Sequence, residues 1–260
     1  MDLGISGRRA IVCASSRGLG RACADALAGE GVDLVINGRE PERLKHTAAE
    51  LRRAHPGVVI TAVAADVTTI EGREALLASC PDPDIVITNN AGPTPGPPLS
   101  ASYQAWSEAL NANMLAALML IGAVVPAMTE RRFGRIVNIT SAMVTTPRTP
   151  LAISAGPRAG LTAVCKAISL EVARHNVTIN NLLPERFDTD RQRYMAQRDS
   201  AAHGITYEEA RQRLVDTIAA GRMGRPEEFG ATCAFVCSAH AGYMSGMNIH
   251  LDGGSYPGLV

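Results

Sequence analysis

The sequence predicts an α/β fold, a single doubly wound parallel sheet of about seven strands with helices on both faces. Short runs rich in β-branched residues alternate with longer helical patterns along the whole chain of 260 residues. Such alternation implies parallel strands joined by right-handed crossovers. The runs themselves alternate little between apolar and polar residues, as expected for strands that are covered on both faces. No Pro- or Ser-rich linker divides the chain, so residues 1–260 are expected to form one domain.

The strands are expected in the order Ala10–Ala14, Asp33–Asn37, Val58–Ala64, Ile85–Thr88, Ile136–Thr140, Thr178–Leu182 and Asn248–Leu251. The helices between them are expected near residues 18–30, 41–54, 69–79, 104–132, 155–175 and 226–239. Residues 184–225 interrupt this alternation, because the segment is polar, rich in Arg and only weakly helical around Tyr207–Ala219. An insertion at the carboxyl edge of a sheet is a natural substrate lid.

Composition favours small-molecule partners and copies of the chain itself. The 25 basic and 25 acidic residues cancel, which leaves no broad electrostatic reason to bind nucleic acid or an anionic membrane. The N-terminus has no signal-peptide pattern, so we expect a cytoplasmic protein. The apolar stretch Met114–Met128 is short for a membrane span and contains Pro126, which favours a buried or interface helix. The six Cys form no CxxC pair, so we predict core packing and no metal site.

A glycine-containing turn follows the first strand and opens directly into a helix. Glycines there let the backbone approach a pyrophosphate, which the free N–H groups and the dipole of the helix N-terminus can hold. The alternative is a tight turn with no ligand. The residues expected to bind a nucleotide are Ala14, Ser16, Arg17, Gly18, Leu19 and Gly20.

The end of the second strand favours NADP(H) over NAD(H). A chain that prefers NAD usually places an Asp or Glu there to bind the ribose hydroxyls, but this chain reads Asn37-Gly38-Arg39. With no carboxylate to repel it, a 2′-phosphate could be held by Arg39 and Arg17. The alternative is that both Arg are solvated surface residues.

With its further motifs the chain resembles the classical short-chain dehydrogenase/reductase family, most closely the branch like 3-oxoacyl-[acyl-carrier-protein] reductase. The resemblance implies a Rossmann-type fold and covers essentially the whole chain. Asn89-Asn90-Ala91-Gly92 after the fourth strand is the most specific match. The other matches are Asp66, Asn113, Ser141, Pro184, Thr189 and Asp252-Gly253-Gly254.

The resemblance implies roles for the matched positions. Asp66 and Val67 would contact the adenine, and Thr189, beyond Pro184, would reach the nicotinamide carboxamide or a phosphate. Asn90, Ala91 and Gly92 would line the adenosine and ribose side. Where the family has Thr-Gly in the glycine turn this chain has Cys13-Ala14, from which we expect an altered turn and not a lost site. Relatives usually form homodimers or homotetramers through the two long helices; the alternative is a hetero-oligomer with another family member.

The catalytic residues depart from the family pattern. In the family a Tyr transfers the proton, a Ser orients the carbonyl, a Lys holds the nicotinamide ribose and an Asn supports a relay water. Asn113 and Ser141 match, but Ser154 stands in the place of the Tyr and Arg158 in that of the Lys. A Ser hydroxyl is a far weaker acid than a phenol and is shorter. Arg158 could grip a ribose diol but stays protonated.

Other residues could supply the missing proton. Glu185 replaces a Gly of the family pattern on the loop expected to pass the nicotinamide, and the lid adds Tyr194 and His203. A solvated Glu185 is the plainer interpretation. Tyr103 and Trp106 are expected to be packing or substrate-wall residues. The lid arginines hint at an anionic substrate unless they are merely solvated; they are Arg186, Arg191, Arg193 and Arg198.

Two functions therefore stay open. One is an NADP(H)-dependent oxidoreductase that acts on a carbonyl or secondary alcohol through an altered proton-transfer apparatus. The other is a catalytically impaired nucleotide-binding or structural subunit that assembles with an active relative.

Overall fold

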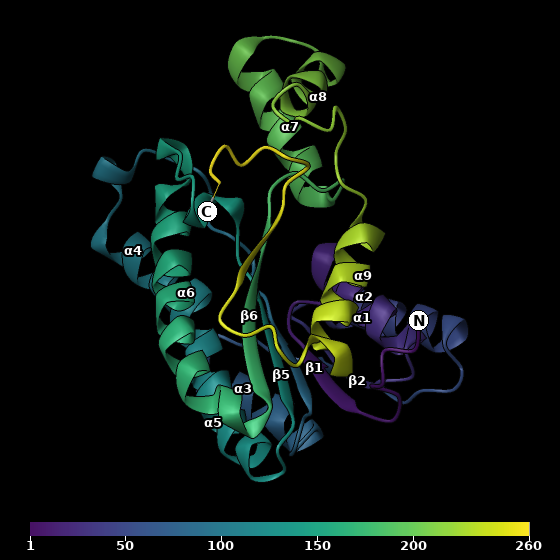
Figure 1. Cartoon of the computed structure of the whole chain (residues 1–260). Helices are drawn as coiled ribbons and strands as arrows, with labels where there is room; N and C mark the ends of the chain where they lie inside the picture. Colours follow the sequence, from purple (N-terminus) through teal and green to yellow (C-terminus); the bar gives the residue numbers. More distant parts are fainter. Residues whose placement is uncertain (260) are drawn as a thin grey trace.

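Seven parallel strands form one sheet in the computed structural model, which describes residues 1–259 (Figure 1). The strand order is β3-β2-β1-β4-β5-β6-β7, so the direction of winding reverses between β1 and β4. At such a switch point the strand ends leave a crevice for a ligand. The predicted fold class is confirmed. The strands are β1 (Arg9–Val12), β2 (Asp33–Gly38), β3 (Ile60–Ala64), β4 (Ile85–Thr88), β5 (Gly134–Ile139), β6 (Val177–Pro184) and β7 (Asn248–Leu251).

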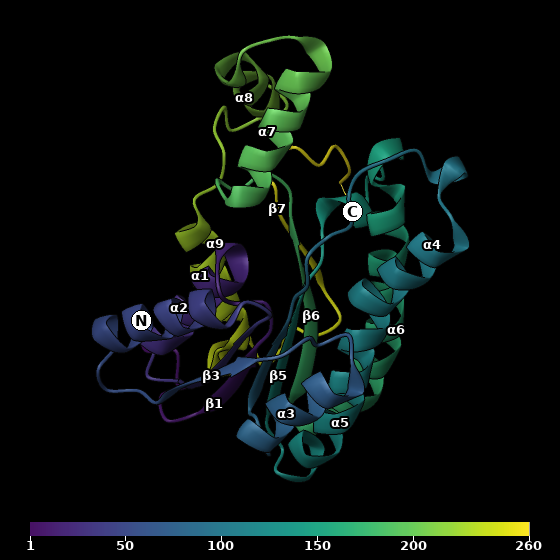
Figure 2. The ribbon, with the colours of Figure 1, turned by 180° about the vertical axis from the view of Figure 1, so that it is seen from behind.

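Helices cover both faces of the sheet, as the view from behind also shows (Figure 2). One layer contains α1 (Gly18–Gly29), α2 (Pro41–Ala54) and α9 (Pro226–Cys237). The other contains α3 (Ile70–Ser79), α4 (Tyr103–Leu110), α5 (Ala116–Glu130) and α6 (Ala152–Val172). Every residue of β4 and β5 is buried, which explains why these runs are apolar without alternation. All six cysteines are free and buried in these layers, as expected.

The long helix expected over 104–132 is not uniform. A π-helical turn, η2 (Asn111–Leu115), separates α4 from α5, and such turns often occur at functional sites. Within the described residues, the continuous stretch Tyr103–Glu130 is the one helix long and apolar enough to cross a membrane. This helical stretch is longer than the apolar run Met114–Met128 found in the sequence. Its inner face packs into the core through Ile121 and Val124.

The insertion after β6 contains two helices, α7 (Asp190–His203) and α8 (Tyr207–Val215). They project beyond the carboxyl edge of the sheet (Figure 1). The prediction covered only the second helix, because α7 buries a single residue, Ala196, and so lacks an apolar stripe. A bridge between Phe187 and Gly224 closes the base of the insertion.

Candidate active site

A cavity of about 600 Å³ opens at the carboxyl edge of the sheet. The glycine turn, the ends of β2 to β6, the start of α6 and one face of α7 form its walls. Of the predicted site residues only Gly20 and Asn113 do not line it. The predicted residues that do are Ala14, Ser16, Arg17, Gly18, Leu19, Arg39, Asp66, Val67, Asn90, Ala91, Gly92, Ser141, Ser154, Arg158, Pro184 and Thr189.

The glycine turn places Ala14 and Gly18 in left-handed backbone conformations. Ala14 has φ +45°, in the left-handed region, and Gly18 has φ +58°. Gly20 is required by space, because a Cβ there would lie 2.4 Å from the carbonyl oxygen of Ala14. The side chain of Arg17 makes no capping hydrogen bond at the start of α1, so the first N–H groups of the helix remain available to an anion.

Asn37 ties together the strand ends beneath this turn, a role that the sequence interpretation missed. Its side chain is buried and its Nδ2 donates to the carbonyl oxygens of Val63 (3.1 Å) and Ala65 (2.9 Å). The backbone N–H of Ala14 donates to Asn37 Oδ1 at 3.3 Å. The signal in the sequence was an amide at the end of an otherwise apolar, buried strand.

The two arginines expected to select NADP(H) lie at the rim of the cavity. Arg39 Nη1 is 3.9 Å from Asp66 Oδ2, and Arg17 Nη1 is 3.2 Å from Asp190 Oδ2 at the start of α7. Burial acts to raise the pKa of Asp66, but hydrogen bonds from Thr68 and the charge of Arg39 together hold that pKa below its usual value. Each arginine is more than half exposed and can turn toward a ligand.

Ser154 and Arg158 stand one turn apart on α6 and face the same spot. A Cβ at Gly92 would lie 3.6 Å from both Ser154 Oγ and Arg158 Nη2, so both polar atoms border the open space beside Gly92. Ser141 caps the short turn after β5, where its Oγ accepts a hydrogen bond from the N–H of Met143 at 3.2 Å. The Ser141 hydroxyl can still donate its own proton into the cavity.

Asn113 lies behind Arg158 instead of lining the main cavity. Arg158 Nη1 donates to Asn113 Oδ1 at 2.8 Å. Asn113 lies in the π-helical turn, and its Nδ2 donates to the carbonyl of Ala109 at the end of α4. Arg158 is only 8% exposed. Burial, with a smaller contribution from the charge of Arg191, lowers the pKa of Arg158 to about 10. Within residues 1–259 no carboxylate forms an ion pair with it.

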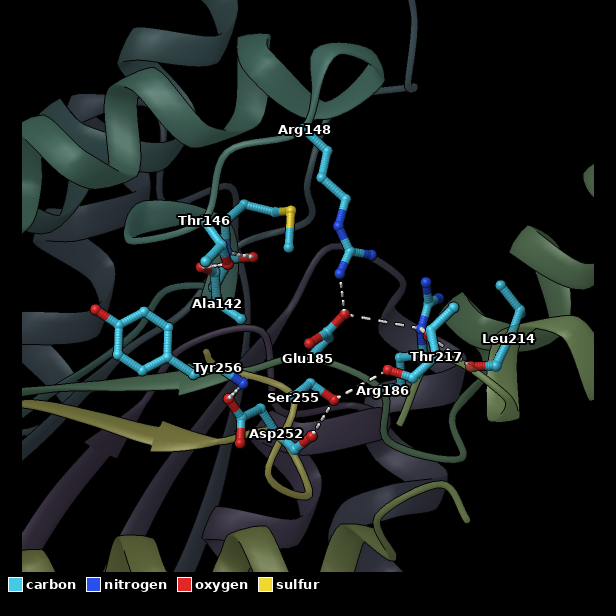
Figure 3. A network of polar contacts seen from close by, with 12 residues as sticks. Ala142, Thr146, Arg148, Glu185, Arg186, Leu214, Thr217, Asp252, Ser255 and Tyr256 are labelled. Atoms are coloured by element: carbon cyan, nitrogen blue, oxygen red, sulfur yellow. Dashed lines mark hydrogen bonds and ion pairs between the residues drawn. The ribbon is translucent and has the colours of Figure 1, made fainter. Parts of the chain in front are cut away.

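Glu185 is not a solvated loop residue, so the plainer interpretation of it was wrong. Its side chain is 6% exposed and lies between two guanidinium groups, 2.9 Å from Arg148 Nη2 and 3.8 Å from Arg186 Nε. Figure 3 shows Arg148 reaching the carboxylate from one side and Arg186 from another. The carboxylate is thus engaged by two arginines, and we do not assign proton transfer to Glu185.

The remaining residues considered for the site differ in whether they line the cavity. Tyr194 on α7 lines the cavity, whereas His203 at the far end of α7 pairs with Asp199 at 3.0 Å and does not line it. Tyr103 is 88% exposed and neither packs nor lines the cavity, contrary to expectation. Trp106 packs as expected, since a Cβ at Gly156 would lie 3.6 Å from its ring.

Comparisons with known proteins agree with this geometry. Residues 13–256 match the family model described as enoyl-(acyl carrier protein) reductase. The 3-oxoacyl-[acyl-carrier-protein] reductase of Aquifex aeolicus is 30% identical over 98% of this chain and 100% of its own length. The NADPH-dependent reductase BacG of Bacillus subtilis is 28% identical over 96% of this chain and 98% of its own. L-sorbose reductase of Gluconobacter frateurii, solved with NADPH and L-sorbose, is 29% identical with a TM-score of 0.93 over the whole of both chains.

The fold, the glycine turn and these matches lead to one conclusion. Family model and relatives span nearly the whole chain, including the turn after β1 and the serines beside the cavity. The chain belongs to the classical short-chain dehydrogenase/reductase family.

Proposed function

We propose that the protein is an NADP(H)-dependent oxidoreductase that interconverts a carbonyl compound and its alcohol through a modified proton-transfer apparatus. One observation supports this most strongly. A single cavity joins the glycine turn and the open N-terminus of α1 to the hydroxyl groups of Ser141 and Ser154. A nucleotide phosphate at one end and a carbonyl at the other would therefore share one space.

The described residues fit the cofactor. The N–H groups at the start of α1 would hold its pyrophosphate, and the close approach at Gly20 keeps the turn open for it. Asp66 and Val67 would contact the adenine, and Arg17 and Arg39 would bind the 2′-phosphate. Asn90, Ala91, Pro184 and Thr189 would line the remainder of the cofactor site. Relatives support this choice, because BacG is named as NADPH-dependent and L-sorbose reductase was solved with NADPH.

The chain's own residues would orient the substrate and supply the proton. When bound, NADPH supplies a hydride to the carbonyl carbon, and the oxygen takes one proton, so carbonyl, NADPH and a proton give alcohol and NADP⁺. Ser141 and Ser154 can both donate hydrogen bonds to the carbonyl oxygen. Arg158 would hold the nicotinamide ribose, steadied by Asn113. We assign the proton to Tyr194 of the lid or to a water beside it, because Glu185 is held as an ion pair.

The first experiment is a fluorescence titration of the purified protein with NADPH, with NADH as the comparison. We expect micromolar binding of NADPH and weaker binding of NADH. Changing Arg39 to Glu should reverse this preference, because a carboxylate repels the 2′-phosphate and accepts hydrogen bonds from the ribose hydroxyls. If neither nucleotide binds, the proposal fails.

Turnover is the second test, measured as NADPH oxidation across a panel of ketones, quinones and thioester-like substrates. Ser141→Ala should remove the activity. Tyr194→Phe should lower kcat about 100-fold if the phenol donates the proton and leave it unchanged if water does. Background rates across the whole panel would contradict an oxidoreductase.

The alternative function is a catalytically impaired subunit that assembles with an active relative. The replacement of the family's Tyr and Lys by Ser154 and Arg158 favours it, and so does the Arg158–Asn113 hydrogen bond, because it engages the family's relay Asn directly. Robust turnover by the protein alone, lost in Ser141→Ala, would exclude this alternative.

We also infer a homodimer or homotetramer built on α5 and α6. Apolar side chains stay exposed on both helices, among them Met119 at 53% and Leu170 at 73%, and burying them would contribute to association. Light scattering of the purified protein should give a multiple of the 27.4 kDa chain mass. Leu170→Glu should shift the equilibrium toward monomer.

A further inference from the structure

Two guanidinium groups face the reaction end of the cavity without an acidic partner. Arg158 comes from α6 and Arg191 from the opposite wall, α7. A Cβ at Gly92 would lie 3.6 Å from Arg158 Nη2 and 3.9 Å from Arg191 Nη2. The same point is 3.6 Å from Ser154 Oγ, so both charges border the space where the carbonyl is expected.

Each of the other arginines that line the cavity has an acidic partner. Arg17 pairs with Asp190, Arg39 with Asp66, and Arg148 and Arg186 share Glu185. In contrast, Arg158 and Arg191 hydrogen-bond only to neutral groups within residues 1–259. Arg158 donates to the amide of Asn113, and Arg191 donates to the backbone carbonyl of Pro93 at 3.2 Å.

A buried charge without a counterion is costly to the folded protein. Arg158 is almost fully buried, and a second positive charge beside it adds repulsion. An anion placed between Arg158 and Arg191 would relieve both costs, and it would do so without breaking an existing ion pair. Planar guanidinium groups are also well shaped to bind a carboxylate through paired hydrogen bonds.

We propose that the substrate is an oxo acid whose carboxylate binds between Arg158 and Arg191 while its carbonyl lies against Ser154 and Ser141. This inference rests on the proposed function and names its substrate class. The pyrophosphate of the cofactor has a separate place, the open N-terminus of α1. The ribose hydroxyls that Arg158 would hold are neutral, so the charges of Arg158 and Arg191 stay uncompensated when the cofactor is bound. The carboxylate of the substrate would supply the missing negative charge.

Arg191 connects substrate binding to the position of Tyr194. Its guanidinium stacks near the ring of Tyr194, with the charge 5.7 Å from the ring centroid, and Tyr194 lines the cavity. A carboxylate bound to Arg191 would thus fix the face of α7 that carries Tyr194. The substrate would order the lid residue that we assign to proton transfer.

The test compares acetoacetate with its methyl ester, which keeps the ketone but carries a methyl group on the carboxyl oxygen and therefore no charge. Trp106 is the only Trp of the chain and packs near α6 two residues from Ser154, so its fluorescence reports binding without turnover. We expect acetoacetate to bind at least about tenfold more tightly than the ester, with or without NADP⁺. kcat/KM for NADPH-dependent reduction should show the same preference.

Substitutions on α7 test whether Arg191 causes the preference for acetoacetate over the ester. Arg191→Gln should weaken acetoacetate about 10- to 100-fold and leave the ester unchanged, and Arg191→Lys should restore part of the loss. The matched control is Arg193→Gln on the same helix. Arg193 is more than half exposed, pairs with Asp190 at 2.7 Å and does not line the cavity, so we expect no change.

Two results would overturn the inference. One is an ester that binds as tightly as acetoacetate. The other is a loss of NADPH affinity in Arg191→Gln as large as its loss of acetoacetate affinity, which would assign Arg191 to the cofactor. Failure of the proposed function gives a different pattern, because acetoacetate would still quench Trp106 selectively while no nucleotide bound.

Discussion

Two buried arginines at opposite edges of the same sheet have very different surroundings. Arg135, at the amino end of β5, donates to the carbonyl oxygens of Ser238, Gly134 and Asn176 at 2.9 to 3.1 Å and to Asn176 Oδ1 at 3.2 Å. Its guanidinium also lies 4.4 Å from the centroid of the Phe133 ring. Arg158, at the carboxyl edge, has one hydrogen bond to an amide.

The different surroundings of Arg135 and Arg158 indicate different roles, one in stability and the other in function. At the amino edge the buried guanidinium donates several hydrogen bonds that connect strands and loops. At the carboxyl edge the charge is left under-solvated, together with a left-handed Ala14 and an uncapped helix start. Functional edges often retain such costs because a ligand relieves them.

Introducing the Tyr and Lys that the family resemblance implies at positions 154 and 158 should have the largest effect on activity. The double change Ser154→Tyr with Arg158→Lys is expected to raise reduction of neutral ketones about 10²- to 10⁴-fold, the usual contribution of a general acid. Ser154→Tyr alone should gain less, because the Lys that lowers the Tyr pKa is missing. A stable variant that binds NADPH but gains nothing would indicate a pocket reshaped for another reaction.

Closing the glycine turn should remove cofactor binding. Gly20→Ala places a Cβ 2.4 Å from the Ala14 carbonyl oxygen, so the turn must shift, and a shift of about 1 Å can cost on the order of 100-fold. NADPH affinity measured by fluorescence should fall by about that factor. Gly29→Ala on the same helix is the control, because its Cβ would meet only His55 at 3.6 Å; an equal loss there would contradict the steric explanation.

Removing the charge at the amino edge should destabilise the fold. Arg135→Met leaves several carbonyl oxygens without donors, which should cost about 3 kcal/mol of the free energy of unfolding. Urea denaturation measures this cost. Arg8→Met is the comparison, since Arg8 is 38% exposed and should lose less than about 1 kcal/mol. Equal losses would contradict the importance of the buried hydrogen bonds.

Removing the buried charge at the carboxyl edge should stabilise the fold. Arg158→Met with Asn113→Leu replaces both partners by apolar groups and is expected to raise the free energy of unfolding by roughly 1 to 3 kcal/mol without ligand. Burial holds the pKa of Arg158 at about 10, so above that pH the folded protein binds fewer protons than the unfolded chain. The natural protein then regains stability, and the advantage of the variant should be present at pH 7 to 9 and shrink above pH 10.

The smallest expected effect concerns the glycine turn itself. Ala14 adopts φ +45°, which costs an L-residue about 1 kcal/mol. Ala14→Gly relieves this strain but makes the unfolded chain more flexible, so a net gain of about 0.5 kcal/mol is expected. Urea denaturation would show a loss instead if the methyl group packs favourably.

The sequence predicted the sheet well, because each buried strand is a short apolar run followed by a helix. It missed α7 because that helix buries only Ala196. Most of the cavity lining was also predictable, since parallel strands bring their carboxyl ends to one edge. Electrostatic pairing was not, because it depends on contacts across the fold. Glu185 meets Arg148 from a segment 37 residues earlier in the chain, and no local pattern places them together.

The six cysteines have a practical consequence for studying the lid. All are buried, and burial raises the pKa of the Cys13 thiol to about 12 and that of Cys165 to about 11. Only thiolates react readily with labelling reagents, so the natural protein should stay unlabelled in its folded state. A single cysteine introduced at the exposed Gln197 of α7 would then be the only residue to carry a spectroscopic probe, which would report whether ligands move the insertion.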